Sequence, residues 1–454
     1  MIEMKIGEHV FEILLPGNTD IYRMKKARVI ADPSCAIKKA LENPVASQQL
    51  TSITKEKLKN NPDSKAVIVI SDNTRPVPYK GEEGILWPVI EILLNSGIKK
   101  KNITILVATG THRPVSEKEL ENMLDERVFQ AGIRIKNHDC KDRENLVYLG
   151  KTTRGSEVYI NKDYISADLK ILTGLVESHF MAGASGGRKS ICPGLIGEES
   201  TYVFHGAQML SSNNVGNLIL EDNPCHEEAL EVAKMAGADF IINVTLDDEF
   251  RLTGVFAGDL EKAHLAAVER LKEYVAIPVQ KQYDLVITHA GFVGINHYQA
   301  AKAAIAAEPL LKPDGKIVMA AITTDSEQVG SPLYRTILHL LKLFGAEKFK
   351  QLINSPDWVF VPEQWQVQMW AKVFSKIPQE NFIYYSPLLP EADYKILPGT
   401  DGNIYLEERD RYRGRVELIA HFINNVVKHY MKKHNGNLDI AYLADGPYGV
   451  PYIN

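Results

Sequence analysis

Two histidines and a lysine surround a run of small residues in the middle of the chain. His179 precedes the run 182–187, the pair Arg188-Lys189 follows it, and His205 lies sixteen residues beyond Lys189. Backbone N–H groups in a glycine-rich run can approach a ligand closely, because glycine has no Cβ. The run and the basic pair together first indicate an anion-binding loop.

Lys189 and His205 each admit more than one function. A lysine after glycines can bind phosphate, although the sequence does not match the P-loop pattern GxxxxGK[ST]. The alternative for Lys189 is covalent attachment through its amine. His205 could bind a metal, but protein sites usually supply three or four donors, and no HxxxH or HxH pattern accompanies it. Further ligands for a metal at His205 would therefore come from a bound molecule.

Polar residues follow three short apolar runs that are typical of buried parallel strands. The runs cover residues 66–70, 103–107 and 169–172. They are followed in turn by Asp72 and Arg75, by His112, and by His179. Because ligands bind at the carboxyl ends of strands in open α/β sheets, we expect the three loops to lie along one edge of one sheet.

The residue types in these loops suit proton transfer and anion binding. Arg75, with Asn73 and Thr74 beside it, suits a carboxylate or phosphate, although an ion pair with Asp72 is the simpler alternative. A single loop histidine often has no function. Two imidazoles at one sheet edge suit acid and base catalysis on both faces of a substrate.

The length of 454 residues predicts two or three domains. The apolar runs and the helical segments between them predict the α/β class with mainly parallel sheets. We expect a catalytic domain over 1–276, a linker at Ile277-Pro278, and a second α/β domain over 277–454, with an active-site cleft between them. The final helix and strand are candidates to pack back on the first domain. In the second domain, Gln299 and Lys302 share one face of an Ala-rich helix over 297–306. That face would suit a carboxylate, although Lys302 alone would more simply be solvated.

Bulk properties exclude several classes of protein. The net charge of −5 gives no reason to expect binding to nucleic acid or to an anionic membrane. No apolar run approaches the roughly 20 residues that span a bilayer, and the acidic, alternating start does not indicate a signal peptide. The 4 cysteines show no CxxC spacing, which argues against a structural zinc site and a disulfide scaffold. A cytoplasmic location is expected.

The chain as a whole resembles the nickel-dependent lactate racemase family. The resemblance rests on six elements in one order, which together are far more specific than any single motif. They are DNTRP at 72–76, THRP at 111–114, ESHFMAGASGGRKS at 177–190, His205, YQAAK at 298–302 and EQWQ at 363–366.

The resemblance implies a nickel-pincer nucleotide, nickel(II) pyridinium-3,5-bisthiocarboxylic acid mononucleotide, covalently attached at Lys189. His205 matches the protein ligand to nickel. The cofactor itself supplies the other donors, so one imidazole completes a square-planar centre. The loop of Asp72, Asn73, Thr74 and Arg75 would hold the mononucleotide. Proteins for cofactor synthesis and nickel insertion are the implied partners.

The resemblance also implies an isomerase that inverts C2 of a 2-hydroxy acid by proton-coupled hydride transfer. His112 and His179 match the two acid/base residues, one for each hand of the substrate. Arg75, Gln299, Lys302 and Trp365 match residues that bind the substrate. The substrate would be lactate or a larger relative, and the small Ala184 leads us to expect room for a bulkier group.

Two rival functions are kept open. The first is a hydrolase with zinc or nickel bound directly by His112, His179 and His205. The second is a non-catalytic nucleotide-binding protein that uses Arg75 and the glycine run as its anion site. Neither rival gives a function to Gln299 and Lys302.

Overall fold

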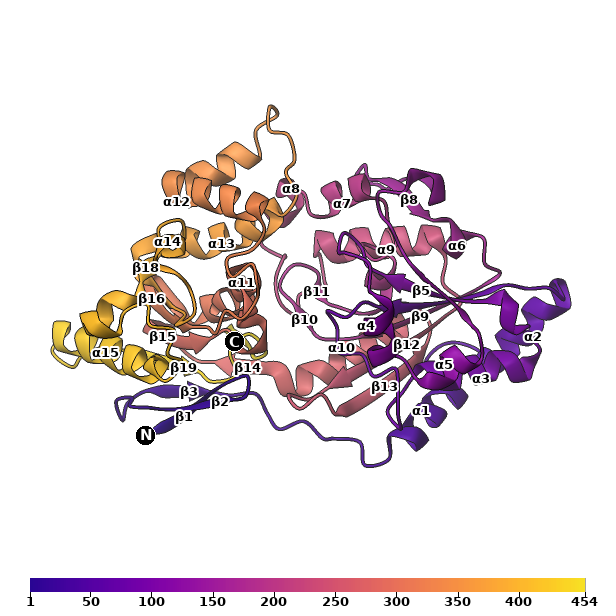
Figure 1. Cartoon of the computed structure of the whole chain (residues 1–454), viewed down its shortest axis with the longest axis horizontal. Coiled ribbons are helices and arrows are strands. Elements are labelled where there is room, and N and C mark those ends of the chain that lie inside the picture. Colours follow the sequence, from indigo (N-terminus) through magenta and orange to yellow (C-terminus); the bar gives the residue numbers. More distant parts are fainter. Residues whose placement is uncertain (454) are drawn as a thin grey trace. The chain divides into compact units, whose positions relative to one another are not determined.

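The computed structural model describes residues 1–453, and the chain divides into two compact units (Figure 1). The central unit is Lys26–Glu273, and the terminal unit joins Met1–Lys25 to Tyr274–Asn454. The expected boundary lies after residue 276, and the division into compact units lies between Glu273 and Tyr274. The expected domain 1–276 nevertheless differs from the central unit, because the first 25 residues belong to the terminal unit.

The central unit is built on a six-stranded sheet with the order β13-β12-β9-β4-β5-β6. Only β13 runs antiparallel to its neighbour. The strands are β4 (Ala66–Ser71), β5 (Ile103–Ala108), β6 (Arg134–Asn137), β9 (Leu169–Leu175), β12 (Phe240–Leu246) and β13 (Leu252–Gly258). The apolar run of β4 is buried on both faces, which explains why its sequence does not alternate.

Helices cover this sheet, and local sequence signals set their ends. Gly97 ends α3 in the left-handed conformation, and Asn223 caps α9 by accepting from the backbone of Cys225 and His226. The longer helices are α1 (Pro33–Glu42), α2 (Leu50–Asn60), α3 (Leu86–Ser96), α4 (Glu117–Met123), α5 (Glu126–Gln130), α7 (Glu198–Phe204), α9 (Pro224–Ala236) and α10 (Lys262–Val275). Side chains of α1 and α3 share one core with β4, β5 and β9.

Short elements complete the central unit. They are the hairpins β7 (Leu146–Lys151) with β8 (Glu157–Asn161) and β10 (Ser178–His179) with β11 (Gly183–Ala184), the helices α6 (Lys162–Ile165) and α8 (Ala207–Leu210), and the 3-10 turn η3 (Gly187–Ser190). The turn η3 contacts β4, β9 and β12, so the segment after the glycine run lies against the sheet.

The terminal unit has its own six-stranded parallel sheet, with the order β18-β17-β16-β15-β19-β3. Its strands are β3 (Asp20–Tyr22), β15 (Tyr283–His289), β16 (Leu311–Ala320), β17 (Phe382–Tyr385), β18 (Thr400–Asp401) and β19 (Ile440–Leu443). Its helices are α11 (His297–Ala307), α12 (Pro332–Ile353), α13 (Gln364–Lys376), α14 (Glu391–Tyr394) and α15 (Leu418–Lys433). The expected α/β class with mainly parallel sheets is confirmed.

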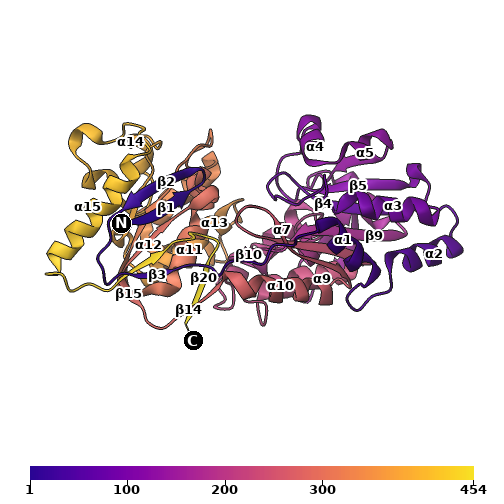
Figure 2. The ribbon, with the colours of Figure 1, turned by 90° about the horizontal axis from the view of Figure 1, so that it is seen from below.

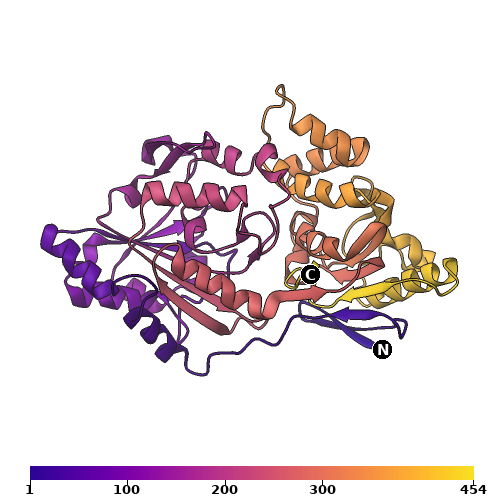
Figure 3. The ribbon, with the colours of Figure 1, turned by 180° about the vertical axis from the view of Figure 1, so that it is seen from behind.

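Both ends of the chain are integrated into the terminal unit. The strand β3 pairs with β19, and the hairpin of β1 (Ile2–Ile6) and β2 (His9–Ile13) packs its apolar face against α15. Figure 2 and Figure 3 show the indigo hairpin beside the yellow α15. The final helix and strand therefore pack within the terminal unit, and the expectation that they pack on the first domain is wrong.

The segment expected to be a linker is a strand. Ile277 and Pro278 lie in β14 (Ala276–Val279), which pairs in parallel with β20 (Val450–Ile453). Proline is tolerated there because β14 has a single partner and lies at a sheet edge. No helix within residues 1–453 is both long and apolar enough to cross a membrane.

Candidate active site

Three loops that carry the predicted chemistry leave one edge of the central sheet. The strand β4 pairs in parallel with both β5 and β9, so the three strands are neighbours and end on the same side. Asp72 and Arg75 follow β4, His112 follows β5, and His179 follows β9. The expected gathering of these loops at one sheet edge is confirmed.

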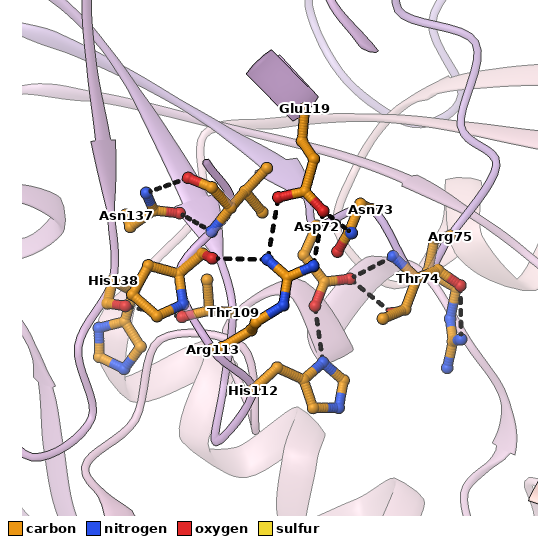
Figure 4. Close-up of polar contacts among 12 residues, drawn as sticks. Asp72, Asn73, Thr74, Arg75, Thr109, His112, Arg113, Glu119, Asn137 and His138 are labelled. Atoms are coloured by element: carbon orange, nitrogen blue, oxygen red, sulfur yellow. Dashed lines mark hydrogen bonds and ion pairs between the residues drawn. The ribbon is translucent and has the colours of Figure 1, made fainter. Parts of the chain in front are cut away.

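His112 is paired with a buried carboxylate. Its Nδ1 lies 2.6 Å from Oδ2 of Asp72, as Figure 4 shows. Burial opposes ionisation of Asp72, but hydrogen bonds from His112 and Thr74 outweigh it, and the pKa of Asp72 lies below its ordinary value. An ionised Asp72 accepts the Nδ1 proton, which leaves a lone pair on Nε2 of His112. The imidazole is thereby prepared to act as a base, and 56% of its side chain is exposed to solvent.

His179 is held in the opposite way. The backbone N–H groups of Met181 and Ala182 both donate to its Nδ1, at 3.2 Å each. A neutral imidazole with an acceptor at Nδ1 carries its proton on Nε2. That Nε2 lies 3.1 Å from Nζ of Lys189.

Lys189 has the chemistry that a covalent tether needs. Burial, assisted by the nearby Arg75 and Arg188 guanidinium groups, lowers the pKa of Lys189 to about 7. An uncharged amine has a lone pair that can attack an activated carboxyl or thiocarboxyl group. It can also accept the Nε2 proton of His179, which accounts for their contact.

The glycine run is shaped by packing, which differs from the first interpretation. Gly183 and Gly187 have positive φ values of 75° and 51°. A Cβ at Gly183 would overlap the carbonyl oxygen of Ile219, and one at Gly187 would lie 2.9 Å from the ring of His264. These glycines therefore let the loop fold tightly against its own protein.

The polar groups of this loop are also used within the protein. The backbone N–H of Ser185 donates to Glu177 O at 2.9 Å, and that of Gly187 donates to Oδ1 of Asn243 at 3.0 Å. Arg188 is buried and donates to Ala182 O at 2.8 Å, while its Nη1 lies 2.9 Å from Nε2 of His264. The interpretation of the run as an anion-binding loop is therefore not supported.

The side chains of the loop after β4 form hydrogen bonds and an ion pair within the protein. Thr74 donates through its backbone N and its Oγ1 to Oδ1 of Asp72, and Asn73 donates to Oε1 of Glu119 at 2.8 Å. Arg75 forms an ion pair with Glu177, with 3.2 Å between Nε and Oε1. The simpler alternative, an Arg75–Asp72 ion pair, is thus replaced by an ion pair with Glu177, which the sequence analysis did not single out.

His205 follows α7 as the residue that ends it, and its backbone N–H donates to Thr201 O at 2.8 Å. Burial, followed by the charge of Lys189, lowers the pKa of His205 to about 3. Its imidazole is therefore neutral near pH 7, the form that binds metals. Within residues 1–453, no group of three or more His, Cys, Asp or Glu side chains is arranged to hold a metal ion. A single neutral imidazole near a reactive lysine fits a metal that a tethered cofactor carries, and the directly bound metal of the hydrolase alternative has no ligand set.

Three predicted substrate residues belong to the terminal unit. Asn296 caps α11 by accepting from the backbone of Gln299, and Lys302 lies one turn further along the same helix. Trp365 lies on α13, and its Nε1 donates to the hydroxyl of Tyr298 at 2.9 Å. The structure therefore brings Trp365 to the start of α11, next to the turn that carries Gln299.

The sequence analysis did not assign two acidic residues of the central unit to the site. Glu177 follows β9 directly, and its place at a strand end was the available signal. Glu119 was not singled out in the sequence analysis. Both accept from residues of the loop after β4, a pairing that no spacing in the sequence reveals.

Comparisons with known proteins were made with the whole chain. The family of lactate racemase N-terminal domains matches residues 6–217, and the family of lactate racemase C-terminal domains matches residues 279–385. A lactate racemase from Lactiplantibacillus plantarum is 34% identical over 354 residues, which cover 78% of this chain and 80% of that protein. One from Thermoanaerobacterium thermosaccharolyticum is 32% identical over 339 residues, covering 74% and 76%.

Solved structures give the same result for the fold. The lactate racemase apoprotein from Thermoanaerobacterium thermosaccharolyticum superposes with a TM-score of 0.82 at 26% identity, covering 99% of each chain. A protein from Thermotoga maritima has a TM-score of 0.61 at 16% identity, covering 90% of this chain and 99% of that one. The second likeness concerns the fold alone.

Proposed function

The chain belongs to the lactate racemase family and is an isomerase of the racemase type, and we propose that it inverts C2 of lactate or of a related larger 2-hydroxy acid. The observation that carries this proposal is the pair of histidines, His112 and His179, on loops that leave the same edge of the central sheet, with His179 beside the amine of Lys189. Racemisation needs a proton acceptor and a proton donor for each hand of the substrate, and two imidazoles can supply both.

The family requires a nickel cofactor. We propose that it is the nickel-pincer nucleotide, attached at Lys189, with His205 as the protein ligand to nickel. When bound, the cofactor would supply the chemistry that accepts a hydride from C2 of the substrate and gives it back. The lowered pKa of Lys189, about 7, makes its uncharged amine accessible near neutral pH, and the imidazole of His205 is neutral there, which are the chemical forms that these attachments need.

The side chains of the protein then transfer the proton and hold the substrate in position. His112 removes the proton of the 2-hydroxyl through Nε2, and Asp72 stabilises the imidazolium that forms. His179 removes the corresponding proton from the opposite enantiomer of the substrate. Arg75 binds the substrate carboxylate, which replaces the carboxylate of Glu177 as its partner.

Other assignments stay predictions. Asp72, Asn73 and Thr74 were expected to hold the mononucleotide, although their side chains already bond within the protein. Gln299, Lys302 and Trp365 are proposed to orient the substrate. Cofactor-synthesis and nickel-insertion proteins are the proposed maturation partners.

The test is intact mass with metal analysis on protein produced with and without the cofactor-synthesis enzymes. We expect one nickel and a cofactor-sized adduct on Lys189 only in the first preparation, together with racemase activity. Active protein without nickel or adduct would refute the proposal. A panel of enantiopure 2-hydroxy acids then identifies the substrate.

A further inference from the structure

Glu119 lies outside the reacting groups but connects the two loops that form the Asp72–His112 pair. Its Oε1 accepts from Nη2 of Arg113 at 2.6 Å and its Oε2 accepts from Nη1 of Arg113 at 2.9 Å. Oε1 also accepts from Nδ2 of Asn73 at 2.8 Å, an arrangement that Figure 4 shows. Asn73 belongs to the loop after β4 and Arg113 to the loop after β5, so one carboxylate joins both.

The carboxylate is fixed in place by the start of a helix. Glu119 and Ser116 form a capping box on α4, in which the backbone N and the Oγ of Ser116 donate to Oε2 at 2.8 and 2.7 Å. Hydrogen bonds from Arg113 and then from Ser116 hold the pKa of Glu119 far below its ordinary value. Glu119 is thus a permanently charged group on a rigid element.

The two connections between the loops run in parallel. The inner connection is the hydrogen bond from His112 to Asp72, and the outer one is the bridge from Asn73 through Glu119 to Arg113. Asn73 directly follows Asp72, and Arg113 directly follows His112. Because more than half of the His112 side chain is exposed, packing alone does not fix its ring.

We propose that Glu119 is a positioning residue for the proton-transfer pair, setting the separation of Asp72 and His112 by bridging Asn73 and Arg113. The inference rests on the proposed function only in taking His112 as a base. Its structural part, the geometry of the Asp72–His112 hydrogen bond, can be measured without any cofactor.

The test compares Glu119→Gln, Arg113→Met and a control, Glu117→Gln. Glutamine at position 119 keeps the capping box, in which either residue type can stand. Its side chain has only one oxygen, so it cannot accept both hydrogen bonds from the Arg113 guanidinium group. Arg113→Met removes the bridge and leaves Glu119 in place. Glu117 is an exposed acid in the same first turn of α4, so its replacement reports on helix charge alone.

The first measurement is the Nδ1–H proton resonance of His112 in cofactor-free protein, assigned by its absence in His112→Gln. We expect both bridge variants to move this resonance upfield or broaden it, while Glu117→Gln leaves it unchanged. The second measurement is racemase kinetics of the loaded enzyme. Loss of one hydrogen-bonded bridge should lower kcat roughly 3–10-fold, with KM within about twofold because the substrate carboxylate site is untouched.

An unchanged resonance in both bridge variants would overturn the inference, whatever happens to kcat. An equal shift of the His112 resonance in Glu117→Gln would also overturn the inference, because the shift would then come from the changed charge of α4 and not from the bridge. A shifted resonance in a protein whose His112→Gln variant keeps full activity would support the positioning by Glu119 and refute the proposed role of His112. The thermal midpoint of each variant confirms that it is folded.

Discussion

His112 and His179 are expected to do the same chemistry, yet the protein holds them by different means. His112 is exposed, and a buried carboxylate accepts from its Nδ1. His179 is partly buried, and two backbone N–H groups donate to its Nδ1. In the first arrangement Nδ1 donates to a carboxylate, and in the second Nδ1 accepts from the backbone. In the cofactor-free protein the two rings are therefore in complementary states.

Under the proposed mechanism, a symmetric reaction would use two histidines that the protein holds differently. His112 presents a lone pair at Nε2, and His179 presents an N–H that faces Lys189. For His179 to act as a base, its Nδ1 must gain a proton, and the turn at Met181 and Ala182 must release the ring. The predictions below test this contrast, from the largest expected effect to the smallest.

Replacing Lys189 should remove racemase activity altogether. Lys189→Gln keeps a polar group beside His179 but loses the nucleophilic amine, so no cofactor can be attached. We expect no measurable racemisation and no retained nickel, by metal analysis and intact mass. Full nickel retention by this variant would show that the tether lies elsewhere.

Removing either histidine should lower the rate by about 10²–10⁴-fold. The contrast predicts that His112→Gln and His179→Gln differ in which substrate enantiomer they still oxidise in a single turnover. The keto acid formed on the enzyme, measured with each pure enantiomer, checks this. If both variants lost the same enantiomer, the assignment of one histidine to each hand would be wrong.

The stability of the cofactor-free protein should depend on pH through Lys189. Its pKa is about 7 in the folded protein and is ordinarily 10.5, so between these values the unfolded chain binds the extra proton. The cost of burying this group is therefore fully present below pH 7 and disappears as the pH rises toward 10.5. Relative to Lys189→Met, the parent should gain on the order of 1–2 kcal/mol between pH 7 and 9. Urea unfolding at both pH values measures the difference, and a constant difference would contradict the shift.

Asp72→Asn should affect one histidine only. Loss of a hydrogen bond to a charged group costs about 1.5–3 kcal/mol, so we expect a roughly 10–100-fold decrease in kcat/KM. In the background of His112→Gln the same substitution should have little further effect, because its partner is already gone. An equal decrease in both backgrounds would mean that Asp72 acts through the cofactor instead.

Glu177→Gln should have the smallest effect, on substrate affinity. Exposed ion pairs are worth about 0.2–1 kcal/mol, so relieving the competition for Arg75 should lower KM for a 2-hydroxy acid about twofold to fivefold. Initial-rate kinetics of parent and variant check this. A higher KM would show that Glu177 orients Arg75 for the substrate.

Local sequence signals predicted much of the fold. Continuous apolar runs identified the strands that carry the site, and the capping box at Ser116 and Glu119 and the helix cap at Asn223 are local patterns of the same kind. These features depend on residues within a few positions of one another, which a sequence shows directly. The order of the motifs also indicated the family.

Features that depend on distant pairings could not be predicted. Nothing near residue 20 reveals that β3 pairs with β19, or that Ile277-Pro278 forms a strand with the end of the chain. Ala184 was expected to leave room for a larger substrate. It is fully buried in β11 opposite Ser178, a placement that the sequence did not reveal, and the expectation about the substrate stays a prediction.

The sequence by itself indicated which residues are candidates for the chemistry, and it determined that three of the loops meet at one sheet edge. Only the tertiary structure decided their protonation and partners. Asp72 faces His112, Glu177 faces Arg75, and burial lowers the pKa of Lys189 to about 7. The reason is physical, because a proton affinity is set by desolvation and by neighbouring charges from distant parts of the chain.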